Sequence, residues 1–235
     1  MRTPLTILLA AAALGLAACG SDDKSASEGS TPTTADGAVD TSAALANAVK
    51  ESSCKKVEKP KPKSVDTPKP KGKLDPSKDY YVNLDTNCGS ISIKLDVKDN
   101  PKTANVLATL AKAGYYDNTA FHRVVKGWVV QGGDPKGDGT GGPDWRVVEA
   151  PSKNAKYSRG VVAMAKTATD PDGASGSQFF IVVGIDAGLP PQYAIAGKVK
   201  TGRKAVDAIS NLGADGADGP PATPVVITKA TLEVK

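Results

Sequence analysis

The stretch that decides the fold runs from Phe121 to Asp134 and reads FHRVVKGWVVQGGD. It holds two short runs of β-branched and aromatic residues, Phe121–Val125 and Trp128–Gln131, separated by Lys126 and Gly127. Such runs are typical of β-strands bounded by turn residues. The pattern predicts two neighbouring strands, with Arg123 on the first and Gln131, eight positions further on, on the second.

Short runs of the same kind recur along the rest of the chain. In one of them Ile91, Ile93 and Leu95 alternate with polar residues, which predicts a strand with one buried face. The turn before it is predicted at Asn87-Cys88-Gly89. Outside the Phe121–Asp134 stretch, the predicted strands are Tyr80–Thr86, Ser90–Leu95, Val161–Ala165, Gln178–Val183, Ala194–Val199 and Val225–Val234.

Two helices interrupt the predicted strands. Asn100 is a suitable N-cap and Pro101 a suitable first helical residue for a helix of about three turns that ends near Gly114. A second helix is predicted to start at Thr201-Gly202. Many short strands with only two helices favour a mostly β domain, a closed antiparallel barrel or a sandwich, over alternating β-α-β units.

Three motifs, in the same order along the chain, resemble those of one known family. The first is the Phe121–Asp134 stretch followed by Gly139-Thr140-Gly141-Gly142-Pro143, and the others are Val162-Ala163-Met164-Ala165 and Gly176-Ser177-Gln178-Phe179-Phe180-Ile181. With them the sequence strongly resembles the cyclophilins, which are peptidyl-prolyl cis-trans isomerases. The resemblance implies a closed antiparallel eight-stranded barrel capped by two helices over residues 79–235.

The reaction that the resemblance implies needs neither a nucleophile nor a metal nor a cofactor. The peptide bond before proline rotates slowly because resonance gives it partial double-bond character, with a barrier of about 18–20 kcal/mol. A catalyst must favour the twisted amide over both planar forms. The resemblance assigns to Arg123 the donor that meets the prolyl nitrogen, and to Gln131 the amide that binds substrate backbone and orients Arg123.

The resemblance also implies an apolar pocket for the proline ring beside these two residues. Backbone near Ala165 and Lys166 is expected to pair with the extended substrate, and Gln178 is expected beside the groove. The expected walls of the pocket are Trp128, Val129, Phe180, Leu189 and Tyr193.

Several positions depart from the family pattern. Lys166 stands where asparagine is common, and Tyr193 stands where histidine is common. Trp128 replaces the usual phenylalanine with a larger ring. Gly188 stands where a tryptophan often favours cyclosporin A, so weak binding of cyclosporin A is expected.

His122 and the Gly139–Gly142 run suggest other chemistries that the sequence does not support. No serine or cysteine nucleophile motif accompanies His122, so a hydrolase is disfavoured and a ring hydrogen-bonded within the fold is expected. The Gly139–Gly142 run lacks the Lys-Ser/Thr of a phosphate-binding loop and indicates a turn. Strand alternation predicts that Phe179 faces the core, opposite to Phe180.

Composition excludes two further classes of function. The 235 residues carry a net charge of +5, but eight of the lysines lie between Lys55 and Lys73. The rest of the chain is therefore not basic, which argues against a nucleic-acid partner. With one histidine and no C-x-x-C spacing among three cysteines, no metal site is expected.

The N-terminus has the features of an export signal. Residues 1–18 hold Arg2 and an apolar run that is too short to span a bilayer. The sequence Leu16-Ala17-Ala18-Cys19-Gly20 resembles a bacterial lipobox, which implies lipidation of Cys19 and a protein anchored to the cell membrane on its extracytoplasmic side. The alternative is a soluble secreted protein with an ordinary cleavage site.

Residues 19–78 are predicted to form a disordered tether. Up to about Ser53 the segment has few large apolar residues, with at most a short helix near Ser42–Val49, and Lys/Pro repeats then favour an extended chain. This part is either a stiff spacer or a lysine patch for anionic lipid or cell-wall polymer. Cys54 and Cys88 form a disulfide in an oxidising compartment or remain two separate thiols.

Together these observations predict an isomerase of X-Pro bonds that assists the folding of exported proteins outside the cytoplasm. Its partners are expected to be proline-containing segments of unfolded or exported chains and the membrane that holds its anchor. The alternative is a binding module, a proline-peptide receptor or holding chaperone, that uses the same groove without turnover.

Overall fold

The two runs around Arg123 form a β-hairpin. In the computed structural model, which describes residues 53–235, β4 (Arg123–Val125) pairs antiparallel with β5 (Val129–Gly132), and Arg123 lies directly opposite Gln131. All described residues belong to one contact unit, residues 39–235. The two neighbouring strands that the sequence predicted for these residues are confirmed.

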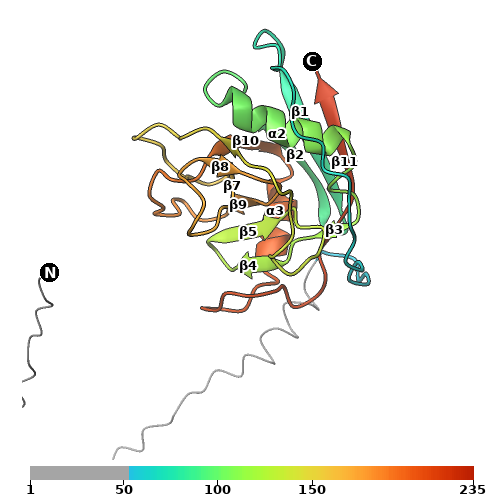
Figure 1. The fold of residues 1–235 in the computed structure, drawn as a ribbon. Coiled ribbons are helices and arrows are strands. Elements are labelled where there is room, and N and C mark those ends of the chain that lie inside the picture. The colour runs from blue at the N-terminus through green and yellow to red at the C-terminus, as the bar shows by residue number, and fades with distance from the viewer. Residues whose placement is uncertain (1–52) are drawn as a thin grey trace, which may run out of the picture. The chain divides into compact units, whose positions relative to one another are not determined.

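The remaining elements follow the predicted pattern closely (Figure 1). Three short strands, β3, β6 and β8, were not predicted. The other elements are β1 (Tyr80–Thr86), β2 (Gly89–Leu95), α2 (Pro101–Lys112), β3 (Thr119–Ala120), β6 (Val147–Val148), β7 (Val161–Met164), β8 (Ala174–Ser175), β9 (Phe179–Val182), β10 (Ile195–Thr201), α3 (Arg203–Ser210) and β11 (Val226–Val234).

Nine strands form one antiparallel sheet in the order β3-β11-β1-β2-β10-β7-β9-β5-β4, and β6 pairs with β8 separately. The first and last strands of this order, β3 and β4, are separated in the chain only by Phe121 and His122. The sheet must therefore curl strongly to bring its two ends together, as Figure 1 shows. Within residues 53–235 a mostly β fold with two helices is confirmed, whereas closure as a barrel of eight strands stays a prediction.

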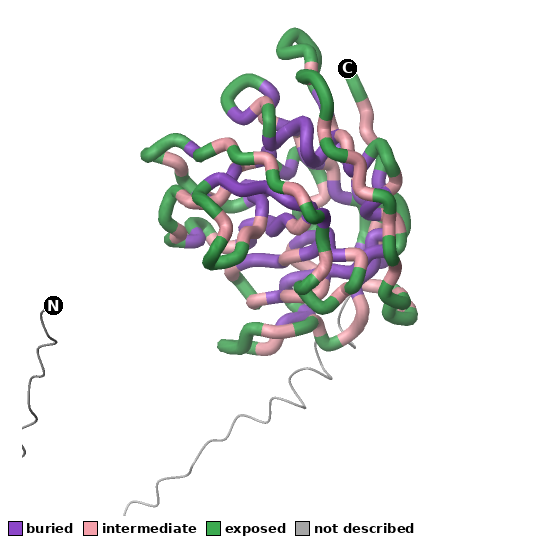
Figure 2. Tube along the Cα trace, viewed as in Figure 1, coloured by how far each residue is buried: buried purple, intermediate pink, exposed green. Residues whose placement is uncertain are grey.

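The main hydrophobic core lies inside this curl and against the two helices (Figure 2). Alternate residues of the strands point into it, as the strand period of two requires. Both helices bury an apolar face there, α2 against β1, β10 and β11 and α3 against β2, β4 and β5. The largest fully buried side chains include Tyr115, Tyr116, Phe121, Phe179, Leu107, Leu110 and Met164.

The start of α2 is capped differently from the prediction. Asn100 is the N-cap residue and Pro101 begins the helix, but the Asn100 side chain makes no capping bond and donates instead to Asp96 Oδ2 at 2.7 Å. The carboxylate of Glu149 accepts the first-turn N–H groups of Lys102 at 3.1 Å and Thr103 at 2.7 Å. An anion supplied by a distant loop therefore satisfies the helix N-terminus.

Residues 53–78, the part of the predicted tether that the structure describes, are called here the N-terminal strap. The strap has almost no regular secondary structure, yet it is fastened to the domain along its length. Lys55 N–H donates to Asn87 O at 2.8 Å, and Lys63 N–H donates to Pro135 O at 3.1 Å. Trp145 Nε1 donates to Thr67 O at 3.0 Å. Composition alone does not indicate these contacts because the partners lie far along the chain.

Apolar contacts and a covalent bond reinforce the strap. Val65 and Leu74 pack against the main core. Cys54 is joined to Cys88, in the β1–β2 turn, by a disulfide. The strap lysines therefore belong to a segment held on the domain surface, although most of them remain exposed.

The export signal at residues 1–18, Cys19 and the tether up to Ser52 lie outside the described residues. Within residues 53–235, no helix has the length and apolar character needed to span a bilayer.

Candidate active site

Arg123 and Gln131 form the centre of the candidate site. Their positions follow from the β4–β5 register, which sets the two side chains opposite each other on the same face of the sheet. Arg123 Nη1 donates a hydrogen bond to Gln131 Oε1 at 3.0 Å, and both side chains are part-buried. The glutamine thus fixes one end of the guanidinium, and a second N–H on Nη1 stays available.

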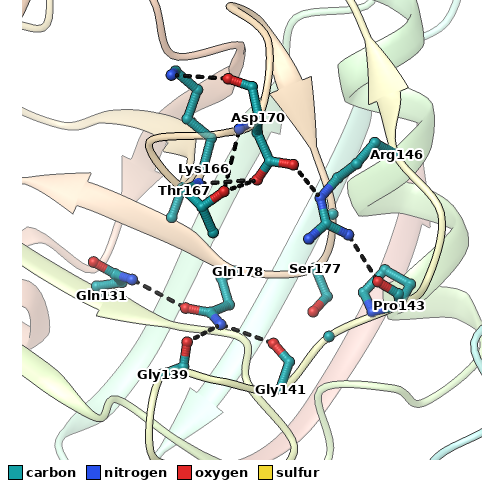
Figure 3. Close-up of a pocket in the computed structure, with 13 residues that line it drawn as sticks. Gln131, Gly139, Gly141, Pro143, Arg146, Lys166, Thr167, Asp170, Ser177 and Gln178 are labelled. Carbon is teal, nitrogen blue, oxygen red and sulfur yellow. Dashed lines mark hydrogen bonds and ion pairs between the residues drawn. The ribbon is translucent and has the colours of Figure 1, made fainter.

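A line of hydrogen bonds extends from Gln131 into the neighbouring loop (Figure 3). Gln131 Nε2 donates to Gln178 Oε1 at 3.1 Å. Gln178 Nε2 in turn donates to two backbone carbonyls, Gly139 O at 2.9 Å and Gly141 O at 2.8 Å. Gln178 therefore orients Gln131, which in turn orients Arg123.

Asp134 organises the loop that supplies those carbonyls. Its fully buried carboxylate accepts N–H groups from Lys136 at 2.8 Å, Asp138 at 3.1 Å and Gly139 at 2.7 Å. Gly133, just before it, has φ +87°, and a Cβ there would lie 2.5 Å from Ser177 O. Only glycine fits this close approach, which the run Gly132-Gly133-Asp134 provides.

Beside Arg123 the surface forms a groove with a volume of about 160 Å³. Ten site residues are expected from the sequence, and nine of them line this groove in the structure. Gln178, the tenth, lines an adjoining hollow that shares Gln131, Ala165 and Lys166 with the groove. The lining of the groove is Arg123, Trp128, Val129, Gln131, Ala165, Lys166, Phe180, Leu189 and Tyr193.

A second apolar cluster, on the outer side of the sheet, forms the floor of this groove. Phe180 is buried and meets the Tyr193 ring edge to face at 5.5 Å between centroids. Tyr157, which the sequence analysis missed, lies fully buried beneath, and its hydroxyl donates to Tyr193 O at 2.7 Å. Trp128 Nε1 donates to Ala187 O at 2.9 Å, which fixes the indole at the rim.

Two acidic residues lie next to Lys166, and one of them, Asp170, lines the hollow beside the groove. The Lys166 ammonium lies 3.6 Å from Asp172 Oδ1 and donates to Asp170 O at 3.3 Å. Asp170 also pairs with Arg146, whose Nε lies 3.3 Å from Oδ1 (Figure 3). Ala165 N–H donates to Gln178 O at 2.9 Å, so this amide is already bonded within the domain. Pairing of a substrate with the backbone near Ala165 and Lys166 stays a prediction.

His122 differs from the expectation of a hydrogen-bonded ring. Neither ring nitrogen has a hydrogen-bond partner among the described residues. Burial lowers the pKa of the imidazole, and the nearby carboxylates of Asp134 and Asp138 oppose this in part. A neutral, unpaired ring fits a packing role better than proton transfer.

Arg123 also contacts a residue that sequence reasoning missed. The carboxylate of Asp218 accepts hydrogen bonds from Nε and Nη2, both at 2.7 Å. Hydrogen bonding to Arg123 lowers the pKa of Asp218 below its ordinary value. No motif marks Asp218, because it lies 95 residues from Arg123 in a loop rich in glycine and alanine.

The site contains no cluster of metal ligands. Within residues 53–235, no group of three or more His, Cys, Asp or Glu side chains is arranged to hold a metal ion. The charged and amide groups around Arg123 are hydrogen-bonded to one another or to backbone, which suits recognition of a peptide.

Comparison with protein families gives one match across most of the described domain. The family model described as cyclophilin type peptidyl-prolyl cis-trans isomerase/CLD matches residues 81–232. A peptidyl-prolyl cis-trans isomerase of Helicobacter pylori is 39% identical over 124 residues, which cover 52% of this chain and 75% of that protein. A probable peptidyl-prolyl cis-trans isomerase B of Mycobacterium leprae is 36% identical over 169 residues, covering 64% and 56%.

A solved structure agrees with these relatives. The cyclophilin type peptidyl-prolyl cis-trans isomerase of Cryptosporidium parvum, crystallised in the presence of the dipeptide Ala-Pro, is 31% identical with a TM-score of 0.59. The match covers 65% of this chain and 98% of that one.

Proposed function

Because the chain belongs to the cyclophilin-type peptidyl-prolyl cis-trans isomerases, we propose that Arg123 and Gln131 carry out the isomerisation in the groove and that exported proteins are its substrates. The observation that carries the assignment of these residues is the bond from Arg123 Nη1 to Gln131 Oε1 at the edge of an apolar groove. Proline-containing peptides, which the family binds, are the ligands of this groove.

Arg123 acts on the bond that must rotate. As the amide twists, resonance is lost and the lone pair of the prolyl nitrogen becomes a hydrogen-bond acceptor. A guanidinium donor meets this lone pair only in the twisted state, so it stabilises the transition state more than either planar form. Arginine suits the task because it stays charged and presents its donors in a rigid plane.

The groove holds the ring while the rest of the bond turns. The side chains of Val129, Phe180 and Leu189 provide apolar walls, and Tyr193 closes one side. A proline ring placed there is removed from water, which contributes about 25 cal/mol per Å² of apolar surface buried. Rotation makes and breaks no covalent bond, so these binding and orienting contacts suffice.

Gln131 has two functions in this proposal. Its Oε1 accepts from Arg123, and its Nε2 donates to Gln178. The glutamine therefore orients Arg123 and can exchange its bond to Gln178 for one to the substrate backbone. The carbonyls of Gly139 and Gly141 keep Gln178 in place during that exchange.

The proposed site of action is outside the cytoplasm. The apolar run in residues 1–18 and the lipobox-like Leu16–Gly20 support export and lipidation of Cys19, and the Cys54–Cys88 disulfide supports an oxidising compartment. The mature chain would be anchored to the membrane and would assist folding of exported proteins. Labelled palmitate should enter the chain in bacterial cells and be lost with Cys19→Ser; unchanged labelling would contradict the anchor.

The proposal extends to the architecture, with a tether from Cys19 leading to the strap and a sheet closed as an eight-stranded barrel. The strap favours counting residues 53–78 with the domain.

The test of the isomerase is the cis-trans exchange rate of a short Ala-Pro peptide, followed by NMR with the full chain. We expect a large acceleration that Arg123→Ala reduces about a hundredfold, the usual effect of losing one transition-state donor. Binding without faster exchange in the unmodified chain would contradict the isomerase and favour the proline-peptide receptor or holding chaperone.

Weak binding of cyclosporin A is also expected. Gly188, exposed at the rim before Leu189, offers no indole to the ligand. Isothermal titration should give a dissociation constant far above the nanomolar range. A nanomolar value would contradict this expectation.

A further inference from the structure

The loop between α3 and β11 passes directly beside Arg123. It is fastened to β4 by a backbone bridge in which Val124 N–H donates to Gly219 O at 2.7 Å. Gly219 follows Asp218, so the bridge fixes the position from which the Asp218 side chain reaches Arg123. The contact between the two side chains therefore rests on a defined backbone arrangement.

The contact has the geometry of a bidentate ion pair. The two carboxylate oxygens of Asp218 accept from Nε and Nη2 of Arg123, each at 2.7 Å. Parallel bonds of this kind fix the plane of a guanidinium, unlike a single charge contact. The third nitrogen of Arg123, Nη1, bonds Gln131, and the Trp128 ring centroid lies 5.6 Å from Cζ.

These contacts leave little freedom to the arginine. Asp218 and Gln131 together bond all three guanidinium nitrogens of Arg123, and both Nη atoms retain a second N–H. The Asp218 side chain is 58% exposed and that of Arg123 30%, so the carboxylate approaches from the solvent side.

We propose that Asp218 is a positioning residue of the isomerase, which holds the Arg123 guanidinium in the orientation that meets the twisted X-Pro bond. This inference rests on the proposed role of Arg123. Asp218 does not line the groove, so its effect is exerted through the arginine. Fixing the side chain in advance removes an entropic cost that would otherwise fall on the transition state.

The same loop provides a matched control. Asp215 pairs with Lys126 Nζ at 2.7 Å, which is a further contact between this loop and the β4–β5 hairpin. Neither Asp215 nor Lys126 lines the groove or contacts Arg123. Replacing Asp215 removes the same charge from the same loop without touching the arginine.

The experiment compares Asp218→Asn with Asp215→Asn in the full chain, using Ala-Pro peptide exchange and the NMR signal of the Arg123 Nε–H. We expect Asp218→Asn to lower kcat about three- to five-fold with little change in KM, in the range of an exposed ion pair of good geometry. In this variant the Arg123 Nε–H should exchange with solvent faster. Asp215→Asn should match the unmodified chain in both readouts, and Asp218→Glu should restore part of kcat.

Three results would overturn the inference. One is an Asp218→Asn chain with unchanged kcat and unchanged Nε–H exchange. Another is an equal loss in Asp215→Asn, which would trace the effect to the loop as a whole. The third is a rise in activity, which would mean that Asp218 competes with substrate. If the unmodified chain fails to accelerate exchange, the proposed function fails, and the Nε–H exchange of Asp218→Asn, which needs no turnover, then tests the holding contact by itself.

Discussion

The inner and outer faces of the curled sheet carry two apolar clusters built from the same strands. In β9, Phe179 points into the main core, where its ring packs edge to face against Tyr116 and Phe121. Phe180, the next residue, belongs to the outer cluster, with the Tyr193 ring on one side and the groove on the other. The alternation predicted for this pair is confirmed.

The difference between the clusters lies in what covers them. The inner cluster is enclosed by the sheet, the two helices and the strap, whereas part-buried side chains such as Trp128 and Leu189 cover the outer one incompletely. Residues that are buried to a similar degree, such as Phe179 and Phe180, therefore have different roles. We expect substitutions inside the sheet to lower stability and those outside to lower substrate affinity.

The largest effect should come from Phe179→Ala. Removing a ring enclosed by other aromatic side chains leaves a cavity, and such changes lower the free energy of unfolding by about 3–5 kcal/mol. Denaturant titration measures the loss, and peptide affinity of the folded fraction should stay unchanged. A loss below about 1 kcal/mol would show that the inner cluster is not closely packed.

Removing the disulfide should lower the stability of the inner side of the sheet and leave the groove on the outer side unaffected. The bond closes a chain segment with a sequence separation of 34 and holds the strap, whose Val65 packs on the main core. Replacing Cys54 and Cys88 by serine should lower the free energy of unfolding by about 2–4 kcal/mol. Thermal unfolding measures this, and kcat on an Ala-Pro peptide serves as the control that should not change.

Phe180→Ala is the matched substitution on the outer face. Because the ring forms a wall of the groove, its loss should weaken peptide binding about tenfold, through roughly 50 Å² of lost apolar contact. The loss of stability should be smaller than that of Phe179→Ala, since the groove is already open on one side. NMR titration with a proline peptide measures the affinity; equal stability losses in the two variants would remove the distinction between the clusters.

The smallest effect concerns pH and His122. Burial lowers the folded-state pKa of His122 below its ordinary 6.5, so the unfolded chain binds more protons between these two values. This contribution to stability is present above pH 6.5 and is lost as pH falls toward the lowered pKa, with a slope of at most about 1.4 kcal/mol per pH unit. Unfolding measured between pH 5 and 8 should show the slope, and His122→Gln should flatten it.

Several elements of the fold could be predicted from the sequence. Alternation of Ile91, Ile93 and Leu95 was enough to define β2, and Pro101 was enough to define the start of α2. The motif around Arg123 supplies four of the residues that line the groove, Arg123, Trp128, Val129 and Gln131, and the rest of the family resemblance supplies the other residues of the lining. The boundaries of the strands differ from the prediction by only one or two residues, because turn residues mark them.

Other features leave no local pattern from which they could be predicted. β3, β6 and β8 are two residues long, too short for any alternation to be visible. The strap resembles a disordered segment in composition and is ordered by contacts with residues far along the chain. That the His122 ring finds no hydrogen-bond partner within residues 53–235 likewise depends on what surrounds it in space.

The sequence alone is enough to predict the mostly β pattern, the two helices and the neighbouring strands that carry Arg123 and Gln131. These follow from period, turn chemistry and short-range register, which are properties of neighbouring residues. Only the tertiary structure decided that Glu149 caps α2, that Tyr157 supports the groove and that Asp218 holds Arg123. Those partners are separated by 36 to 95 residues, and the strong curl of the sheet, which no local pattern encodes, brings them together.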